Sequence, residues 1–161
     1  MKYLIRKMSQ EDIKDVQNVA KKSWHATYEG IIPSEIQDNF LKHAYSDDMM
    51  EYRLKNSNMY VAEVEGEVIG FINFSFLNEN NESELSAIYI KPEYQGHGIG
   101  TQLLQVYISE FPKVEAIYLD VEKENNIGLS FYKKKGFEVV DEYDDNFDGH
   151  ILKTLRMKLE V

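Results

Sequence analysis

Apolar and polar positions in the first thirty residues predict a strand followed by a helix. The apolar-rich segment 2–7 is typical of a strand. Apolar residues then recur at helical spacing between Ile13 and Trp24, so we expect a helix from about residue 10 to the mid-twenties. Ser9–Asp12 resembles a capping box at its start. The segment Tyr28–Pro33 contains Gly and Pro and predicts a break in the chain.

A short second helix, a further segment that could be helical and a β-hairpin are predicted next. Ser34–Gln37 is a second capping signature and precedes a short apolar helical pattern. Ser46 can cap a third helical segment. Residues Met59–Val64 and Val68–Phe76 are typical of strands, and the intervening Glu65–Glu67 predicts a tight hairpin turn.

The second half of the chain continues the alternation of strands and helices. After a polar loop, the segment that starts at Glu84 reads as a strand ending at Pro92. Gly136 is a typical helix C-cap for the last predicted helix. The remaining predicted elements are the loop Leu77–Ser83, a helix from about Ile99, a strand Ala116–Val121, a helix Asn125–Lys135, strands Phe137–Val140 and Ile151–Leu159, and an acidic loop at 141–150.

This element order, β-α-α-β-β-β-α-β-α-β-β, predicts an α/β (α+β) fold. A mixed sheet would carry helices on both faces. The length of 161 residues fits one domain over 1–161, with 43% hydrophobic and 29% charged residues typical of a globular chain. We find no internal repeat and no linker.

Three glycines in five residues join the central strand to the next helix. Gly96, Gly98 and Gly100 would let the backbone turn tightly and leave its N–H groups accessible at a helix N-terminus, which favours an anionic ligand. Thr101 stands where a dinucleotide-binding fingerprint needs a small residue, and no lysine follows as a P-loop requires. A tight turn without a ligand is the alternative.

The charge balance narrows the class of partner. The net charge of −10 disfavours nucleic acid and anionic membranes and favours a cationic partner, although it also serves solubility alone. No apolar run approaches 18 residues, so we expect no membrane span. Without cysteine, neither a disulfide nor a thiolate nucleophile is available, and the four histidines form no close pair, so we expect a cytoplasmic protein without a metal site.

Two segments together carry a resemblance to a known family. One is Ile88–Gly100, which reads IYIKPEYQGHGIG, and the other is Asn125–Phe137, which reads NNIGLSFYKKKGF. In this order they resemble the pyrophosphate loop and the second motif of the GCN5-related N-acetyltransferase (GNAT) superfamily. Gly128 departs from the alanine usual there, which weakens the helix slightly. The resemblance covers nearly the whole chain and implies a single-domain, mostly antiparallel central sheet flanked by helices.

The resemblance implies acetyl-CoA as the acetyl donor. The backbone of the central strand would pair with the pantetheine arm, and the glycine-rich turn would bind the pyrophosphate through N–H groups. Asn125 would contact the lower pantetheine arm, and Tyr132 would protonate the leaving thiolate. The implied cofactor-binding positions are Ile88, Tyr89, Ile90, Gln95, Gly96, His97, Gly98, Ile99, Gly100, Thr101 and Asn125.

Acetyl transfer to an amine also needs a base, because a protonated amine has no lone pair. Asp120 lies five residues before Asn125, where a branch of the family has an acidic proton acceptor. Glu84 begins the central strand, where many members have a glutamate. We slightly prefer Glu84 because its side chain is longer, and either could act through water.

The acceptor wall is expected from the first helices and the acidic loop. His25 and Tyr28 follow the first helix, whereas Trp24 fits the core. Asp144 and Asp145 lie in the acidic loop, which could attract a small cationic amine such as a polyamine or simply be a solvated turn. A protein or peptide acceptor, or a non-catalytic acyl-CoA-binding module, are the alternatives, and a homodimer is left open.

Overall fold

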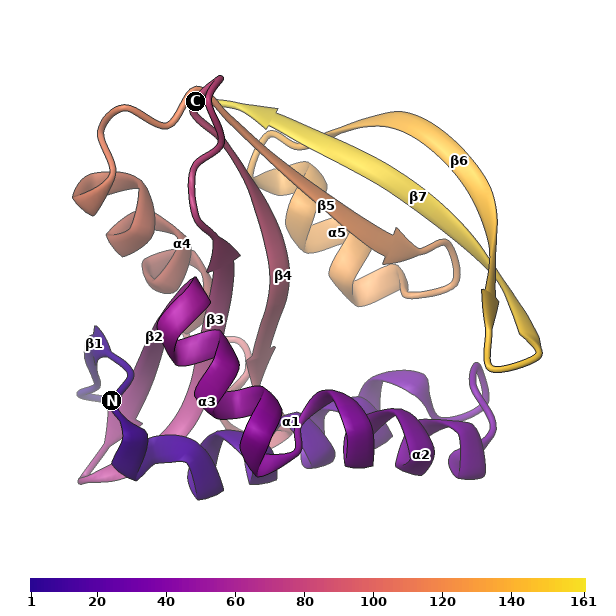
Figure 1. The fold of residues 1–161 in the computed structure, drawn as a ribbon, viewed down its shortest axis with the longest axis horizontal. Coiled ribbons are helices and arrows are strands. Elements are labelled where there is room, and N and C mark those ends of the chain that lie inside the picture. The colour runs from indigo at the N-terminus through magenta and orange to yellow at the C-terminus, as the bar shows by residue number, and fades with distance from the viewer.

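A computed structural model describes residues 1–161 as one seven-stranded sheet with helices on both faces (Figure 1). The strands lie in the order β1-β2-β3-β4-β5-β7-β6. No helix is both long and apolar enough to cross a membrane. The strands are β1 Leu4–Lys7, β2 Ser57–Val64, β3 Glu67–Ser75, β4 Glu82–Ile90, β5 Ala116–Glu122, β6 Glu138–Phe147 and β7 His150–Glu160, and the helices are α1 Ile13–Tyr28, α2 Ser34–Ala44, α3 Asp47–Asn56, α4 Ile99–Glu110 and α5 Asn126–Lys134.

The two halves of the sheet meet at one short parallel contact. Strand β4 pairs with β5 only where Glu82–Glu84 lie beside Ala116–Tyr118. Every other neighbouring pair is antiparallel. Beyond Glu84 no strand pairs with β4 on that side, so β4 and β5 diverge, as their ribbons do in Figure 1. A shift in the β3–β4 register around Ser86 accompanies the divergence.

Two hydrophobic cores fill the two faces of the sheet. One core packs α1, α2 and α3 against β2 and β3, with Trp24 and Phe71 among its buried residues. The other packs α4 against the opposite face, and Tyr107 stacks on Phe74 with ring centroids 3.6 Å apart. The sheet is therefore sandwiched between helices, as the element order predicts.

The acidic segment is a hairpin strand, which corrects the predicted loop at 141–150. Strand β6 runs through it to Phe147 and pairs with β7 in antiparallel register. Only Asp148 and Gly149 form the turn, and both have positive φ, of 50° and 83°. Asp-Gly at such a position is a strong hairpin signal. Pairing with β7 therefore outweighs the low strand propensity of the acidic residues.

Two of the predicted helix caps have different outcomes. Ser46 caps α3 as predicted, since its Oγ accepts the N–H of Met49 at 3.2 Å. Ser34 was predicted as a cap but is the first residue of α2. Gln37, the expected partner in that capping box, is buried, and its Nε2 donates to the carbonyls of Tyr28 and Ile32. Gln37 thereby holds the α1–α2 connection.

An ion pair anchors the start of α1. Both oxygens of the buried Asp12 carboxylate accept from Arg6, at 2.8 and 3.0 Å, and Asp12 also accepts the Ser9 N–H at 2.8 Å. The Arg6 hydrogen bonds are the main cause that lowers the pKa of Asp12. This contact sets where α1 begins and thus where its C-terminal residues lie.

We predict that Asp12→Asn destabilises the protein in a pH-dependent way. Loss of the charged hydrogen bonds should lower the free energy of unfolding by about 1.5–3 kcal/mol at pH 7. Because the folded pKa of Asp12 is lowered, its contribution is present above about pH 4 and is lost as pH falls through the folded pKa. The difference in the free energy of unfolding between wild type and variant, measured by urea unfolding, should therefore shrink below about pH 4.

The exposed neighbour Glu11 provides the matched control for this experiment, as Glu11→Gln. A pH-independent loss in Asp12→Asn, or an equal loss in Glu11→Gln, would contradict the assigned role of the Arg6–Asp12 pair.

Candidate active site

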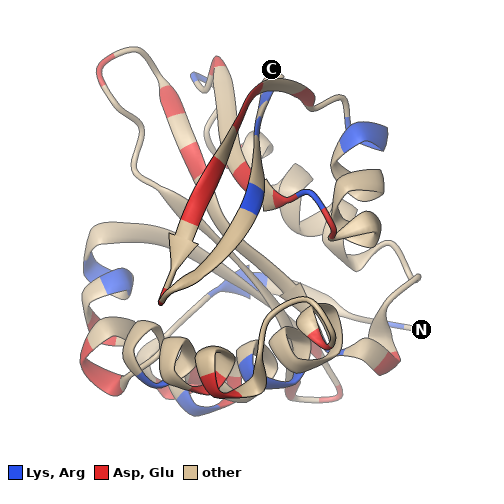
Figure 2. Ribbon diagram, turned by 90° about the vertical axis from the view of Figure 1, so that its right-hand side faces the viewer, with Lys and Arg blue, Asp and Glu red and all other residues tan.

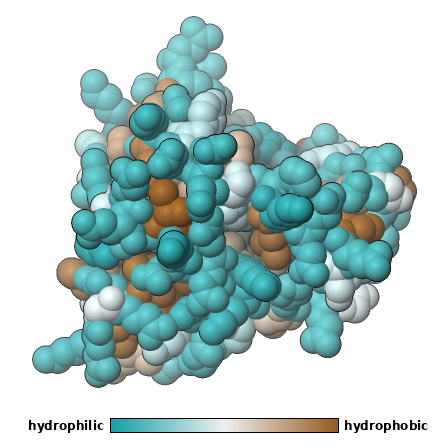
Figure 3. Space-filling model, turned by 60° about the horizontal axis from the view of Figure 1, so that its bottom comes forward, coloured by the Kyte–Doolittle hydropathy of each residue, from teal (hydrophilic) through white to brown (hydrophobic).

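The divergence of β4 and β5 opens a cleft through the sheet. The cleft has a volume of about 1020 Å³ and is lined by residues of α1, α3, α4 and α5 as well as the two strands. Figure 3 brings forward the side of the molecule that carries α1, α2 and α3, and this surface is largely hydrophilic with separate apolar areas. A cleft between two strand edges can admit a ligand from each face of the sheet.

The glycine-rich turn forms an N–H-rich site at one end of the cleft. Gly98 is the N-cap of α4 with φ 77°, and Gly96 has φ 82°, both in the left-handed region that favours glycine. The first intrahelical hydrogen bond of α4 is donated by Gln102 to Gly98, so the N–H groups of Ile99, Gly100 and Thr101 are available to an anion.

Close packing explains the third glycine. A Cβ on Gly100 would lie 3.3 Å from the ring of Phe131 and 3.4 Å from the side chain of Ile90. This glycine therefore allows α4, α5 and β4 to converge. Most of the turn lines the cleft, whereas His97 is exposed and lies outside the lining.

The edge of β4 is the second feature of the donor side. Ile88, Tyr89 and Ile90 line the cleft, and no strand pairs with this part of β4 on the side facing β5. The carbonyl of Ile90 accepts from Ser23 Oγ at 3.0 Å and from Gln95 Nε2 at 3.1 Å. An unpaired strand edge can hydrogen-bond an extended ligand.

Helix α5 contributes Asn125 and Tyr132 to the opposite wall. The Asn125 side chain caps the helix by accepting the Gly128 N–H at 3.0 Å, and it also lines the cleft. A Cβ at Gly128 would lie 2.7 Å from the Asn125 side chain, which accounts for glycine there. The Tyr132 phenol lines the cleft, and burial followed by the nearby Glu122 raises its pKa, so the hydroxyl stays protonated.

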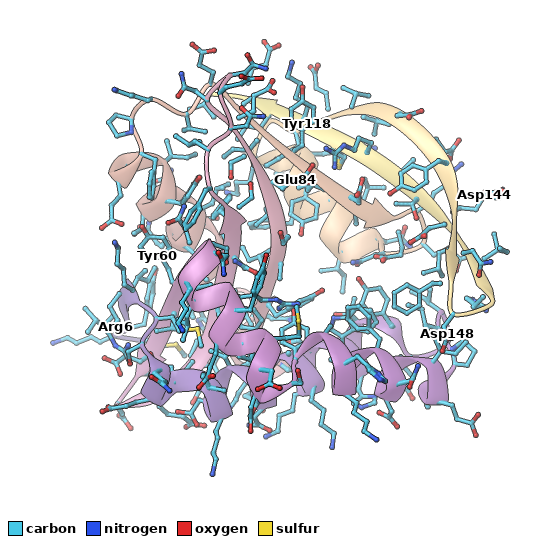
Figure 4. All side chains as sticks on the ribbon, in the orientation of Figure 1. Arg6, Tyr60, Glu84, Tyr118, Asp144 and Asp148 are labelled. Atoms are coloured by element: carbon cyan, nitrogen blue, oxygen red, sulfur yellow. The ribbon has the colours of Figure 1, made fainter.

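Arg156 of β7 binds both of the carboxylates predicted as bases. Its Nη1 donates to Glu84 Oε2 at 3.0 Å and to Asp120 Oδ1 at 3.3 Å, and its Nη2 donates to Glu84 Oε1. The guanidinium also lies 5.0 Å from the ring centroid of Tyr118. Glu84 and Tyr118 face each other where the strands separate (Figure 4). Asp120 lines the cleft, but Glu84 does not.

Glu122 is a carboxylate in the cleft that sequence reasoning did not single out. Its Oε2 accepts the hydroxyl of the buried Tyr28 at 2.7 Å, and it has no ion-pair partner. Burial, then Asp145 and Asp120, raises the pKa of Glu122, against the lowering effect of the Tyr28 hydrogen bond. The period of a strand could have indicated it, because residues 120 and 122 lie on one face of β5.

The predicted acceptor residues separate into two groups. Tyr28 and Asp145 line the cleft. His25 lies in a neighbouring hollow and pairs with Asp38 at 3.1 Å, so it does not reach the cleft. Asp144 points away from the cleft and pairs with Lys153 at 3.0 Å. Figure 4 shows Asp144 on the outer side of β6, and Figure 2 shows acidic residues along that strand.

The tip of the β6–β7 hairpin closes the cleft on the side of α2. Phe147 lies 5.1 Å from Phe40 and 5.9 Å from Trp24, measured between ring centroids. Asn39 donates to Asp148 at 3.1 Å, and His150 Nε2 lies 3.1 Å from the carbonyl oxygen of Ile31. The hairpin tip beside α2 is visible in Figure 1. No cluster of three or more His, Asp and Glu side chains is suited to hold a metal ion.

Comparisons with known proteins agree with this geometry. The family model described as "Acetyltransferase (GNAT) family" matches residues 18–137, which is more than half of the chain. The match includes the glycine-rich turn, both strands of the cleft and the whole segment Asn125–Phe137.

Individual relatives match over most of their length. A spermidine N(1)-acetyltransferase of Thermoplasma acidophilum is 34% identical to this chain, and the match covers 89% of this chain and 92% of the relative. An N-alpha-acetyltransferase of Sulfurisphaera tokodaii is 29% identical, and the match covers 73% of this chain and 78% of that relative. The crystal structure of PaiA N-acetyltransferase from Thermoplasma acidophilum, in complex with coenzyme A, superposes with a TM-score of 0.89 at 30% identity and covers 100% of both chains.

These matches and the arrangement of the cleft lead to one assignment. The chain belongs to the acetyltransferase (GNAT) family and is an acetyl-CoA-dependent N-acetyltransferase.

Proposed function

We propose that this enzyme acetylates a small cationic amine, with a polyamine such as spermidine as the leading acceptor. The observation that carries this proposal is the charge of the cleft. Four carboxylates line it, whereas a single arginine, Arg53, is its only Lys or Arg. The carboxylates are Asp120, Glu122, Glu124 and Asp145. An acidic cleft with low-dielectric walls concentrates cationic substrates.

The closed end of the cleft favours a small acceptor over a polypeptide. The contacts of Phe147, Asp148 and His150 with the α1–α2 region join the two sides of the acceptor end. A peptide would need an open groove along which its backbone could extend. The similarity to an N-alpha-acetyltransferase keeps a peptide N-terminus as the second candidate.

The remaining residues suit direct transfer between two bound substrates. The N–H groups after Gly98 are suited to the pyrophosphate of acetyl-CoA, and the free edge of β4 is suited to its pantetheine arm. The amine would attack the thioester carbonyl, the C–S bond would break, and Tyr132 would donate its proton to the departing thiolate. The protonated phenol and its position in the cleft support this role.

An acceptor panel tests the proposed function. Release of free coenzyme A thiol should be followed with spermidine, a neutral hydrophilic amine and a basic peptide with a free N-terminus. We expect kcat/KM to be highest for spermidine. A higher kcat/KM for the peptide would transfer the assignment to the second candidate.

We predict that Gly98→Asp abolishes tight binding of coenzyme A. The substitution places a carboxylate where the pyrophosphate is expected and a side chain at a left-handed backbone position. Gly66→Asp is the matched control, because Gly66 has a similar φ of 82° in a turn outside the cleft lining. Calorimetric titration should show lost affinity only for the first variant. Unchanged affinity in folded Gly98→Asp would contradict the pyrophosphate site.

We predict that Tyr132→Phe lowers kcat by about 10²–10⁴-fold, the usual contribution of a general acid. The ring and its packing against Phe137, 5.7 Å away between centroids, are retained. The affinity for coenzyme A should therefore change little. Tyr3→Phe, at a partly buried tyrosine outside the cleft lining, serves as control. An undiminished kcat in Tyr132→Phe would leave this residue a packing role only.

We predict that Asp145→Asn raises KM for spermidine more than KM for a neutral amine. Asp145 lines the cleft, so its charge would contact the acceptor, and the effect should weaken at high salt because exposed charges are screened over about 8 Å. Asp144→Asn changes the adjacent carboxylate on the opposite side of β6. Equal effects of the two variants would indicate general electrostatic attraction instead of contact by Asp145.

A further inference from the structure

The carboxylates around the cleft differ in whether a cation already balances them. Arg156 donates to both Glu84 and Asp120, and hydrogen bonding to Glu84 raises its own pKa further, so the arginine stays charged. Arg156 thereby engages both oxygens of Glu84 and one oxygen of Asp120, the atoms that an ammonium group would need. Glu84 is also absent from the cleft lining. Neither residue therefore has the properties expected of the base.

Glu122 has the opposite surroundings. It lines the cleft, and its side chain receives a hydrogen bond from the Tyr28 hydroxyl and forms no ion pair with lysine or arginine. A carboxylate withdrawn from water without a counter-ion is electrostatically unfavourable. A positively charged group that enters the cleft beside Glu122 would relieve this cost, and an ammonium group is such a ligand.

We propose that Glu122, oriented by Tyr28, binds the reactive ammonium group of the acceptor and takes its proton. This inference rests on the proposed acetyl transfer to an amine and assigns the base within it. Glu122 replaces Glu84 and Asp120 in that role, and Arg156 and its two carboxylates become the support that holds the strands of the cleft.

The proton balance of the reaction follows from these positions. One N–H bond of the ammonium group breaks and its proton passes to Glu122, which leaves the nitrogen lone pair free. The nitrogen attacks the thioester carbonyl, and the C–S bond breaks as the carbonyl re-forms. The nitrogen loses a second proton as the amide forms. This proton makes up for the one that Tyr132 donates to the thiolate, so the phenol is protonated again at the end of the reaction. Glu122 returns its proton to solvent, so the products are the amide, free coenzyme A thiol and one proton.

The groups around Glu122 predict the sign of its pH dependence. Tyr28 of α1, Tyr89 of β4, Asp120 of β5, Tyr132 of α5 and Asp145 of β6 face it. The phenols keep their protons at neutral pH, since burial raises the pKa of each. Burial and the two aspartates raise the pKa of Glu122, so kcat/KM should fall on the acid side at a pH above that of an ordinary glutamate.

The test compares pH profiles of kcat/KM for whichever amine the wild-type enzyme acetylates fastest. Glu122→Gln should lower kcat/KM by about 10²–10⁴-fold at neutral pH. The loss should shrink as pH approaches the amine's own pKa, so the acid limb of the wild type is replaced by a rise in kcat/KM that continues up to the pKa of the amine. Tyr28→Phe should move the acid limb to higher pH, because the Tyr28 hydrogen bond lowers the pKa of Glu122.

Controls separate this proposal from a structural effect. Glu142→Gln removes an exposed carboxylate that pairs with Lys123 at 2.8 Å and should leave the profile unchanged. Unchanged affinity for coenzyme A shows that each variant is folded. Glu84→Gln and Asp120→Asn should keep the acid limb.

Three outcomes would overturn the assignment of Glu122. They are an acid limb that stays at the wild-type pH in Glu122→Gln, replacement of that limb by the amine's own in Glu84→Gln or Asp120→Asn instead, or a rise in KM alone with kcat unchanged. If the wild-type enzyme released no thiol with any amine, the proposed function itself would be wrong. That outcome can be distinguished from the three above, in which the wild type is active.

Discussion

The early separation of β4 and β5 is the constraint on which the rest of this molecule depends. The strands pair over only three residues and then diverge, which leaves the edge of β4 without a partner strand. Buried backbone N–H and C=O groups need hydrogen-bond partners, so an open strand edge inside a domain is costly unless a ligand or water satisfies it. The same edge that weakens the sheet thereby provides an extended binding surface next to the N-terminus of α4.

Arg156 stabilises the point at which the strands separate. It comes from β7 and reaches past β5 to Glu84 on β4, while it also binds Asp120. The contact joins the two halves of the sheet where backbone pairing ends. It also pairs with two carboxylates, so Asp120 differs from the other acidic residues of the cleft, Glu122, Glu124 and Asp145, which form no ion pair. This division is what distinguishes structural carboxylates from those available to a substrate.

The β6–β7 hairpin connects the shape of the cleft to its charge. One side of β6 places Asp145 and Phe147 toward the cleft, and the other side places Glu142 and Asp144 in exposed ion pairs with lysines. The tip then packs on α2 through Phe147 and Asp148. A single hairpin thus joins the two sides of the cleft at one end and contributes negative charge to its lining.

Local signals in the sequence were sufficient for most of the architecture. The glycine-rich turn before α4 follows from backbone preferences of residues close in the chain, and the structure has it as predicted. The order of strands and helices also agrees, except that three helices instead of two separate β1 from β2. The hairpin at Asp148–Gly149 was also encoded locally, in an Asp-Gly turn that the acidic composition obscured. The Ser34 cap failed because Gln37 found partners in the preceding segment instead.

Only the tertiary structure decided which carboxylates are paired with a cation. Glu84 and Arg156 are 72 positions apart, and Tyr28 and Glu122 are 94 apart, so no local pattern relates the members of either pair. Compensation of a charge depends on contacts and burial that form when distant strands and helices pack. The sequence by itself therefore determined the fold and the family of the donor site, whereas the folded chain determined the electrostatic state of each acidic side chain around the acceptor.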